Sequence, residues 1–341
     1  MKKGRIINII ISTLLLALFL YLAFRNVNLP ELFSILKTTN YLYVFLGGLI
    51  GVVGGSFIRS VRWRYLLAPI KKDTKMKNLF STTVIGYMVN NLIPRSGEVV
   101  RPVLFGKSEG ISRAAAFGTI IVERIIDTVM FLLMFGVCLI FFKNRITDAF
   151  PEMNTAVIIL SALSFLLTIW VLFTMFKTEL SLKILKIFLK VFPSRIHEKV
   201  DKIFTSLVFG FESLKKPDLL IKITIYSIVL WLVYLTSTIV PFYSFGILSG
   251  SDFSLWETIW DGNLLLVLIS VSMFVPSPGA TGPYHYIVKV TLTVIFSIDN
   301  AKALGYATST HAMGFIIYLI LGLYYFIVSN YKISELKEKT A

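Results

Sequence analysis

Six long apolar stretches limit what this chain can fold into. Each holds about 20 mostly apolar residues, the length an α-helix needs to cross the hydrocarbon core of a bilayer. They lie at roughly 6–24, 41–58, 114–142, 155–176, 219–243 and 303–328. The 341 residues are 56% hydrophobic and 16% charged, whereas soluble domains are about one quarter charged. We therefore predict an all-α, polytopic membrane bundle that forms a single domain over residues 1–341.

Basic residues are distributed unevenly between the loops that join these stretches. With a cytoplasmic N-terminus and two shorter, interrupted apolar stretches treated as re-entrant hairpins, 25 of the 34 basic residues fall on the cytoplasmic side and five fall outside. The other four lie at membrane depth. This is the bias that the positive-inside rule requires, so both termini are predicted to be cytoplasmic and residues 143–153 and 249–257 to lie outside. The net charge of +15 is thereby explained by orientation and anionic lipid, and no nucleic-acid partner is expected. Segment 177–216 spaces its apolar residues as an amphipathic interfacial helix does.

Two shorter apolar stretches, about 79–93 and 259–275, are each interrupted by proline and glycine. Residues 90–102 (NNLIPRSGEVVRP) and 272–286 (SMFVPSPGATGPYHY) share an apolar pair, a proline, two residues and a glycine. Two re-entrant hairpins that enter from opposite sides would form an inverted repeat, although two unrelated kinks fit the pattern as well. The residues predicted to break the helices are Pro94, Gly97, Pro276, Pro278, Gly279 and Gly282.

Such breaks favour an anion-binding site near the midplane of the membrane. Backbone at membrane depth must be buried in protein or line a wet cavity, and a helix that begins there points free N–H groups into the cavity. Charged side chains follow the first break at Arg95, Glu98 and Arg101. They also open the third span in the sequence ERIID, which contains Glu123, Arg124 and Asp127. Ionised groups at this depth usually face an interior or a path for water.

Two interpretations of these charges remain open, and they can coexist. One is an ion-pair network that locks the first hairpin to the third span. The other is a site for an anionic lipid headgroup, in which acids orient arginines that grip a phosphate. Neutral donors at the second break, Ser277, Thr281 and His285, are candidates for the same headgroup, and His285 could instead be structural.

The basic cluster at the end of the second span also allows two interpretations. Arg59, Arg62 and Arg64 flank Trp63, and they predict either a cytoplasmic anchor or the cytoplasmic mouth of the cavity. No histidine or cysteine spacing suits a metal, and no phosphate loop or nucleotide fingerprint occurs. We therefore expect no metal, no cofactor and no catalytic residue in the strict sense.

Four motifs together resemble the lysylphosphatidylglycerol synthase transmembrane-region family, the flippase-like domain of the multiple peptide resistance factor. They are RWRYLL at 62–67, IPRSGEVVRP at 93–102, ERIID at 123–127 and PSPGATG at 276–282, and the resemblance covers nearly the whole chain. It implies a helical bundle with paired re-entrant helices and a role in moving a charged or glycosylated lipid across the cytoplasmic membrane. Relatives often carry an acid after the second glycine-rich turn, where this chain has Tyr284 and His285.

Three functions are compatible with the sequence. The first is a flippase or scramblase whose partners are membrane lipids: an anionic or glycosylated phospholipid, or a polyprenyl-phosphate-linked lipid. The second is a membrane-embedded enzyme that acts on a lipid-linked phosphate, and the third is a scaffold for a separate transferase. The resemblance does not extend to a soluble aminoacyl-transfer domain, so the chain is expected to be transporter-like and to make no lysyl-lipid by itself.

Overall fold

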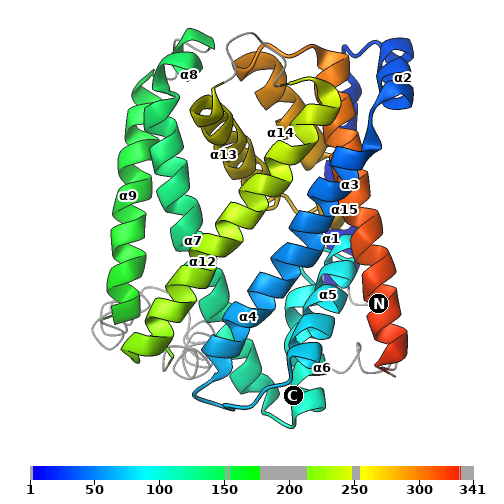
Figure 1. The fold of residues 1–341 in the computed structure, drawn as a ribbon. Helices are drawn as coiled ribbons and strands as arrows, with labels where there is room; N and C mark the ends of the chain where they lie inside the picture. The colour runs from blue at the N-terminus through cyan, green and yellow to red at the C-terminus, as the bar shows by residue number, and fades with distance from the viewer. Residues whose placement is uncertain are drawn as a thin grey trace.

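A computed structural model describes residues 3–149, 152, 154–176, 213–247, 254–329 and 331 of the chain. Within these residues every regular element is helical and none is a strand. Figure 1 shows the helices, which run mostly along one direction. Their bounds are α1 Lys3–Phe24, α2 Leu29–Thr38, α3 Tyr41–Leu49, α4 Gly55–Leu67, α5 Met76–Leu92, α6 Gly97–Glu109, α7 Arg113–Phe141, α8 Lys143–Ala149, α9 Asn154–Phe176, α12 Pro217–Ile239, α13 Leu255–Ser272, α14 Pro283–Val290 and α15 Asn300–Val328.

Short turns of tighter or wider helix join several of these elements. The π-helical turn η1 (Ile50–Gly54) joins α3 to α4, and η5 (Thr291–Ile295) follows α14. The 3₁₀ turn η3 (Val240–Phe245) follows α12, and the 3₁₀ turn η4 (Pro278–Ala280) precedes α14. Because η1 continues α3 into α4, the three form one span from Tyr41 to Leu67.

The predicted membrane-spanning architecture is confirmed, with a finer count of spans. Four helical segments in the described part of the chain are long and apolar enough to cross a membrane, and a bent pair formed by α1 and α2 raises the number to five. The predicted span at 155–176 corresponds to α9, whose apolar portion Asn154–Trp170 is shorter than the full criterion. The predicted amphipathic helix lies almost entirely in residues 177–212, outside the described residues.

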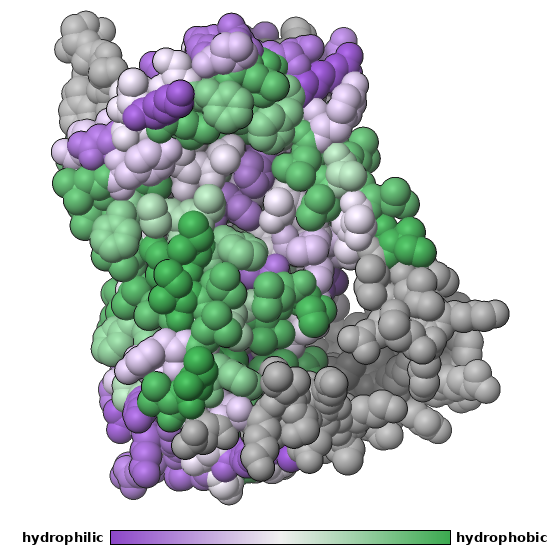
Figure 2. Space-filling model, turned by 90° about the vertical axis from the view of Figure 1, so that its right-hand side faces the viewer, coloured by the Kyte–Doolittle hydropathy of each residue, from purple (hydrophilic) through white to green (hydrophobic). Residues whose placement is uncertain are grey.

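The surface has the polarity expected of a membrane protein. Figure 2 shows hydrophilic side chains at both ends of one face and a hydrophobic belt between them. Large apolar residues such as Leu14, Leu166 and Ile320 are more than half exposed, which lipid tolerates and water does not. Near its middle the belt is interrupted by hydrophilic side chains (Figure 2).

A sharp bend in the first span was not predicted from the sequence. The helix axis turns by 89° between Phe24 and Leu29. Asn26 adopts a left-handed φ of 62°, and the Asn28 side chain accepts a hydrogen bond from the Glu31 N–H to begin α2. Pro30 occupies the first turn of α2, where its missing N–H needs no partner. After the bend the chain continues as the short helix α2, nearly perpendicular to α1.

The first predicted break lies between α5 and α6, which form a closely packed hairpin. Ile93 leaves the helical conformation and Arg95 takes a left-handed φ of 60°. The chain turns back at Gly97, where a side chain would collide with the Gly86 carbonyl of α5. Glycine at this position therefore allows the two helices to approach closely.

The second predicted break lies between α13 and α14. Gly279 and Gly282 have φ values of 55° and 93°, conformations that L-residues with side chains rarely adopt. At Gly282 an added Cβ would lie 2.8 Å from the Leu16 carbonyl oxygen of α1. This break is therefore seated directly against the first span.

The two hairpins lie in opposite halves of the molecule and meet near its middle. Figure 1 shows α5 and α6 in the half that holds the C-terminal ends of α4 and α15, and α13 and α14 in the half that holds α2 and α8. The Arg95 guanidinium donates to the Phe274 carbonyl at 3.2 Å, which joins the two breaks directly. The segments predicted to be outside, α8 and the beginning of α13, thus share one end of the bundle.

Candidate functional site

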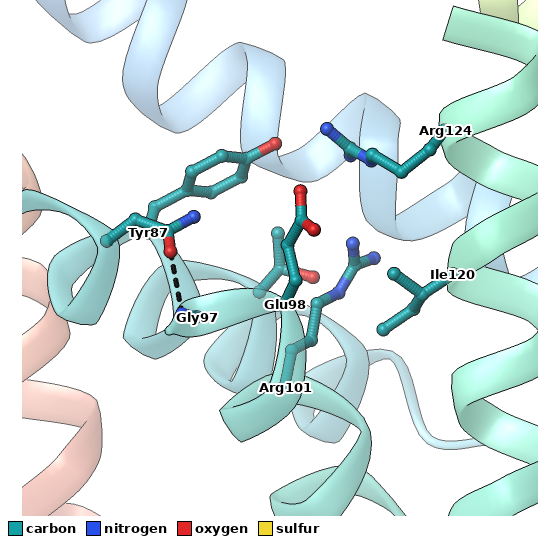
Figure 3. Close-up of a pocket in the computed structure, with 9 residues that line it drawn as sticks. Tyr87, Gly97, Glu98, Arg101, Ile120 and Arg124 are labelled. Atoms are coloured by element: carbon teal, nitrogen blue, oxygen red, sulfur yellow. Dashed lines mark hydrogen bonds between the residues drawn. The ribbon is translucent and has the colours of Figure 1, made fainter. Parts of the chain in front are cut away.

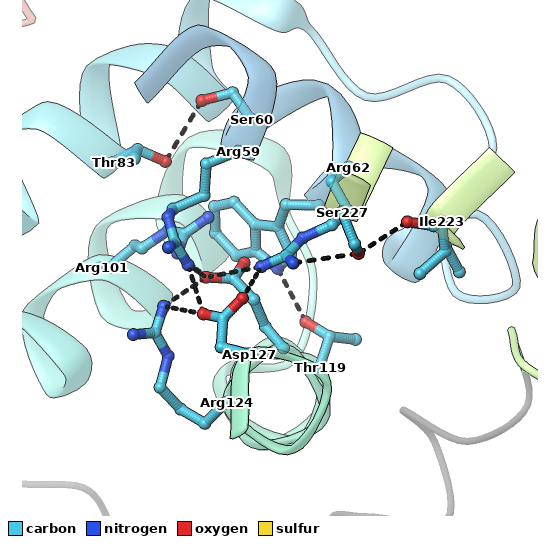
Figure 4. Close-up of polar contacts among 12 residues, drawn as sticks. Arg59, Ser60, Arg62, Thr83, Arg101, Thr119, Arg124, Asp127, Ile223 and Ser227 are labelled. Atoms are coloured by element: carbon cyan, nitrogen blue, oxygen red, sulfur yellow. Dashed lines mark hydrogen bonds and ion pairs between the residues drawn. The ribbon is translucent and has the colours of Figure 1, made fainter. Parts of the chain in front are cut away.

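Six charged side chains from three helices converge beside the first break. We name this group the arginine cluster. Figure 4 shows most of its members and their contacts. The cluster consists of Arg59 and Arg62 from α4, Arg101 from α6, and Glu123, Arg124 and Asp127 from α7. Residues that are three or four apart on a helix share a face, which is why α4 and α7 each present more than one charge to the same place.

Glu123 is the centre of the cluster and is 0% exposed. Its Oε1 lies 2.7 Å from Arg59 Nη1, 2.9 Å from Arg101 Nη1 and 2.7 Å from Arg124 Nη2. A single carboxylate oxygen thus receives donors from α4, α6 and α7. Burying an isolated carboxylate is very costly, so Glu123 depends on these arginines to stay charged.

Asp127 lies one helical turn further along α7 and binds the arginines of α4. Its Oδ2 is 2.8 Å from Arg59 Nη1, and its Oδ1 is 2.7 Å from Arg62 Nη2. Arg124 approaches the same carboxylate at 3.3 Å. The predicted ion-pair network is therefore present, and it joins the first hairpin to both α4 and α7.

The cluster contains more positive than negative charge. Four guanidinium groups face two carboxylates, which leaves an excess of two positive charges at membrane depth. Several buried donors also have no hydrogen-bond partner among the described residues: Arg59 Nε, Arg62 Nε, Arg101 Nε, Arg101 Nη2 and Arg124 Nε. The Glu123 Oε2 acceptor is also without a partner. Because buried polar groups are usually satisfied and the unpartnered donors outnumber this acceptor, the arrangement suits an additional anion.

Aromatic and hydroxyl groups hold the arginines in place. The Arg101 guanidinium lies 3.9 Å from the centre of the Trp63 ring, in cation–π geometry. Trp63 in turn donates from Nε1 to Thr119 at 2.8 Å. From α12, Tyr234 accepts from Arg59 and Ser227 accepts from Arg62, at 3.3 and 3.2 Å.

A small open cavity lies against one side of the cluster. It offers about 20 Å³ to the centre of a water-sized sphere, which is room for about one water molecule, and Figure 3 shows Glu98, Arg101 and Arg124 directed toward it, with the Tyr87 ring nearby. Gly97, at the beginning of α6, also lines the cavity, and its N–H donates to Asn90 Oδ1 at 2.6 Å. The full lining is Thr83, Gly86, Tyr87, Asn90, Gly97, Glu98, Arg101, Ile120 and Arg124.

The structure brings together only part of the predicted headgroup site. Arg101, Glu123, Arg124 and Asp127 form the cluster, and Glu98 faces the adjoining cavity without a hydrogen bond or ion pair to Arg101 (Figure 3). Arg101 is instead oriented by Glu123 on another helix. The expectation that Glu98 holds Arg101 rested on their spacing alone, and the long arginine side chain reaches past its own helix.

The other predicted members lie elsewhere. Arg95 is exposed and bonds to the Phe274 carbonyl rather than entering the cluster. At the second break, Ser277 is buried with an unpartnered Oγ, and His285 Nδ1 accepts from the Gly282 N–H at 3.4 Å. Thr281 is partly buried. None of these four side chains contacts the arginine cluster in the described part of the chain.

Arg59 and Arg62 were predicted at a cytoplasmic mouth, but both are buried inside the cluster. Arg59 is 5% and Arg62 1% exposed, whereas Arg64 remains exposed. The signal was available, because Arg59 and Arg62 are three residues apart and therefore share a face that Arg64 does not. Sequence reasoning named Trp63 only as part of the basic cluster, and it missed Tyr87 and Asn90, since aromatic and amide residues are unremarkable near a helix end.

Comparison with known proteins identifies the family. Residues 6–322 match the lysylphosphatidylglycerol synthase TM region. The chain belongs to this family. The predicted resemblance is therefore confirmed over nearly the whole chain. Glu98, Arg101, Glu123, Arg124 and Asp127, which carried that resemblance, all lie in or beside the arginine cluster.

Similar proteins are found in several archaea. A UPF0104 membrane protein of Methanocaldococcus jannaschii is 30% identical over 135 residues, which are 39% of this chain and 40% of that protein. One of Methanothermobacter thermautotrophicus is 25% identical over 200 residues, 55% of this chain and 58% of that protein. Both alignments thus cover less than two thirds of the relative. One of Pyrococcus horikoshii is 24% identical over 280 residues, 78% of this chain and 81% of that protein.

Proposed function

We propose that this multi-pass membrane protein moves a charged or glycosylated lipid across the cytoplasmic membrane and holds its phosphate at the arginine cluster. The observation that carries the proposal is that four guanidinium groups face the carboxylates of Glu123 and Asp127 beside an open cavity. The cavity lining adds one further carboxylate, Glu98, and an excess of one positive charge remains. A lipid phosphate supplies the missing negative charge. Family membership supports a role in lipid handling.

The contacts within the cluster explain how arginines can be kept ready for such a ligand. Glu123 and Asp127 each hold more than one guanidinium, so the donors are oriented before the phosphate arrives. Arg101 keeps two buried nitrogen donors, Nε and Nη2, without hydrogen-bond partners among the described residues. Its planar fork suits a phosphate oxygen pair better than a lysine does.

The orientation in the membrane is part of the proposal. The positive-inside bias supports cytoplasmic termini, and the end of the bundle that holds α6 and the C-terminal end of α15 would then face the cytoplasm. On this orientation the first hairpin opens toward the cytoplasm. A cysteine at Lys75→Cys, in a Cys138→Ala background, should react only with reagent on the cytoplasmic side; labelling from outside would reverse the orientation.

The proposal is tested with the purified full chain in liposomes. The measurement is redistribution of a fluorescent anionic phospholipid and of a fluorescent glycolipid that has no phosphate. Arg101→Gln should fold, because Glu123 keeps Arg59 and Arg124. Loss of one charge-assisted contact is worth about 1.5–3 kcal/mol, roughly ten- to a hundredfold in affinity for the anionic lipid. The phosphate-free lipid should be much less affected.

Two further variants sharpen the test. Arg101→Lys keeps the charge and loses the fork, so it should be impaired less than Arg101→Gln. Arg25→Gln changes an exposed arginine that belongs to no cluster, and it should behave as the parent does. If Arg101→Gln folds normally and moves the anionic lipid like the parent, the anion site is refuted. A chemically altered lipid would identify an enzyme, and neither redistribution nor product would identify a scaffold.

A further inference from the structure

Two histidines meet at the second break, away from the arginine cluster. His285 is on α14 and His311 is on α15, and their ring centres are 4.7 Å apart. His285 is 6% exposed. Histidine is the side chain that ordinarily gains and loses a proton near neutral pH. Ionisable groups buried at membrane depth are commonly part of a transport mechanism.

Backbone hydrogen bonds define which ring nitrogens carry hydrogen. His311 Nε2 donates to the Gly279 carbonyl at 2.8 Å, since a carbonyl can only accept. The Gly282 N–H donates to His285 Nδ1 at 3.4 Å, since a backbone N–H can only donate. Both histidines therefore hold the backbone of the second break, one as donor and one as acceptor. In its neutral form, His285 carries its hydrogen on Nε2.

Because Nε2 of His285 already carries a hydrogen, an added proton can bind only at Nδ1. That nitrogen would change from acceptor to donor and would face the Gly282 N–H, so the hydrogen bond at the break would be lost. A charge on either ring would also repel a charge on the other at this short separation. Protonation thus opposes the observed conformation of the break.

The surroundings offer no negative charge to compensate a protonated ring. No hydrogen bond or ion pair joins either histidine to a carboxylate in the described ranges. On α13, Asp261 is paired with Arg145, and neither η4 nor η5 carries a titratable side chain. The other titratable groups on the helices packed against α14 and η4 are Lys3, Arg5 and Tyr21 on α1, Lys77 and Tyr87 on α5, Glu257 on α13, Tyr284, Tyr286 and Lys289 on α14, and Lys302, Tyr306, Tyr318, Tyr324 and Tyr325 on α15.

We propose that His285 and His311 form a proton-binding site, and that proton uptake from water opens the second break. The proposal rests on the lipid-translocation function proposed above, to which it adds proton coupling. A proton binds better when the break is open. Water can then solvate the charged ring and accept a hydrogen bond from Nδ1, which the Gly282 N–H cannot do. A ligand that prefers one of two conformations shifts the population toward it. Translocation should therefore speed up as the pH falls.

The test measures lipid translocation in liposomes of the full chain across the range in which histidine titrates, about pH 5.5–8. The rate for the parent should rise on acidification by up to about tenfold per pH unit, the limit for uptake of one proton. His285→Asn and His311→Asn keep polar groups that can bond the backbone but cannot titrate, and each should flatten the profile. His197→Asn, which changes the third histidine of the chain, should keep the parental slope.

A second measurement does not depend on transport. NMR of ring-labelled histidines in lipid nanodiscs follows protonation directly, and the two Asn variants assign the signals. We expect His285 and His311 to take up a proton over the same pH range as the change in rate. If neither histidine protonates, the proposal is overturned.

The outcomes separate this proposal from the one on which it rests. A parent that moves lipid at a rate independent of pH, or a His285→Asn variant that keeps the slope, overturns proton coupling and leaves translocation intact. A parent that moves no lipid at any pH overturns translocation, and the NMR titration then decides whether the proton site exists.

Discussion

The two helix breaks share a sequence pattern and differ in how they handle charge. The first break adjoins four arginines and two carboxylates whose charges do not balance. At the second break, Arg95 reaches across from the first break to the Phe274 carbonyl, and the cation of the break's own helix α14, Lys289, is engaged with backbone carbonyls. Lys289 Nζ donates to the carbonyls of Leu22, Ala23 and Arg25 at 3.4, 2.9 and 3.0 Å.

This difference indicates that the charged groups of the two halves of the bundle have different roles. Lys289 stabilises the C-terminal end of α1, where carbonyls have no partner within the helix and a positive charge is favourable. Among the described residues, no arginine of the cluster donates to a carbonyl at a helix end. On the proposed function, the surplus charge of the first half is available to a ligand, whereas Lys289 in the second half bonds the end of α1.

The largest expected effect comes from removing the centre of the arginine cluster. Glu123→Gln leaves four arginines facing Asp127 alone. Breaking a buried pair by removing one partner costs about 3–5 kcal/mol, so the variant should melt well below the parent in detergent or fail to fold. Thermal unfolding measured by circular dichroism tests this.

Glu98→Gln is the matched control for that variant. It makes the same chemical change on a glutamate that faces the cavity and bonds to no arginine of the cluster. It should melt close to the parent. Equal melting of Glu123→Gln and the parent would mean that water or lipid, rather than Glu123, neutralises the arginines.

A smaller effect is expected at the second half. Lys289→Met leaves the carbonyls at the end of α1 without a donor, a loss of about 1–3 kcal/mol. The variant should be less stable, yet it should keep the parental preference for anionic over phosphate-free lipid. Thermal melting tests the loss of stability, and the liposome assay tests the lipid preference. Lys37→Met, at an exposed position of α2, controls for the loss of a positive charge, and a changed lipid preference in Lys289→Met would contradict the division of labour.

The sequence predicts the helices of this protein well because the apolar length needed to cross a bilayer is a strong constraint. It also predicts that Arg101, Glu123, Arg124 and Asp127 belong to an ion-pair network or a binding site, since charged side chains are rare within membrane-spanning helices. It does not predict the bend after Phe24, which depends on the left-handed turn at Asn26 and the capping by Asn28.

The membership of the cluster could be predicted only in part, because it depends on tertiary packing. Arg59 and Arg62 join it only because α4 packs against α7 and α12. Arg95 has the same side chain and lies next to the break, but its left-handed backbone directs it to the Phe274 carbonyl. Spacing along a helix identifies residues that share a face and cannot identify which helix lies opposite.

The smallest effect on stability is expected at Glu109, at the far end of the first hairpin. The Glu109 carboxylate at the end of α6 bonds to Lys71 Nζ and Asn78 Nδ2, each at 2.7 Å, and to the Lys75 N–H at 3.1 Å. Burial alone would raise the pKa of Glu109, but these hydrogen bonds outweigh burial and lower the pKa below its ordinary value. The first hairpin is thus closed by charge at this end also.

A lowered pKa in the folded state makes the stabilisation depend on pH in a defined direction. The contribution of Glu109 is present above the unfolded pKa of about 4.3 and is lost as the pH falls through the lower folded value. Because Lys71 is partly exposed, the contribution is about 1 kcal/mol or less. Glu109→Gln should therefore melt slightly below the parent at neutral pH, with the difference shrinking in acid. Asp73→Asn, at an exposed position in the neighbouring loop, should match the parent throughout this pH range. A difference in melting between Glu109→Gln and the parent that grows on acidification would contradict the stabilising role of the Glu109 carboxylate.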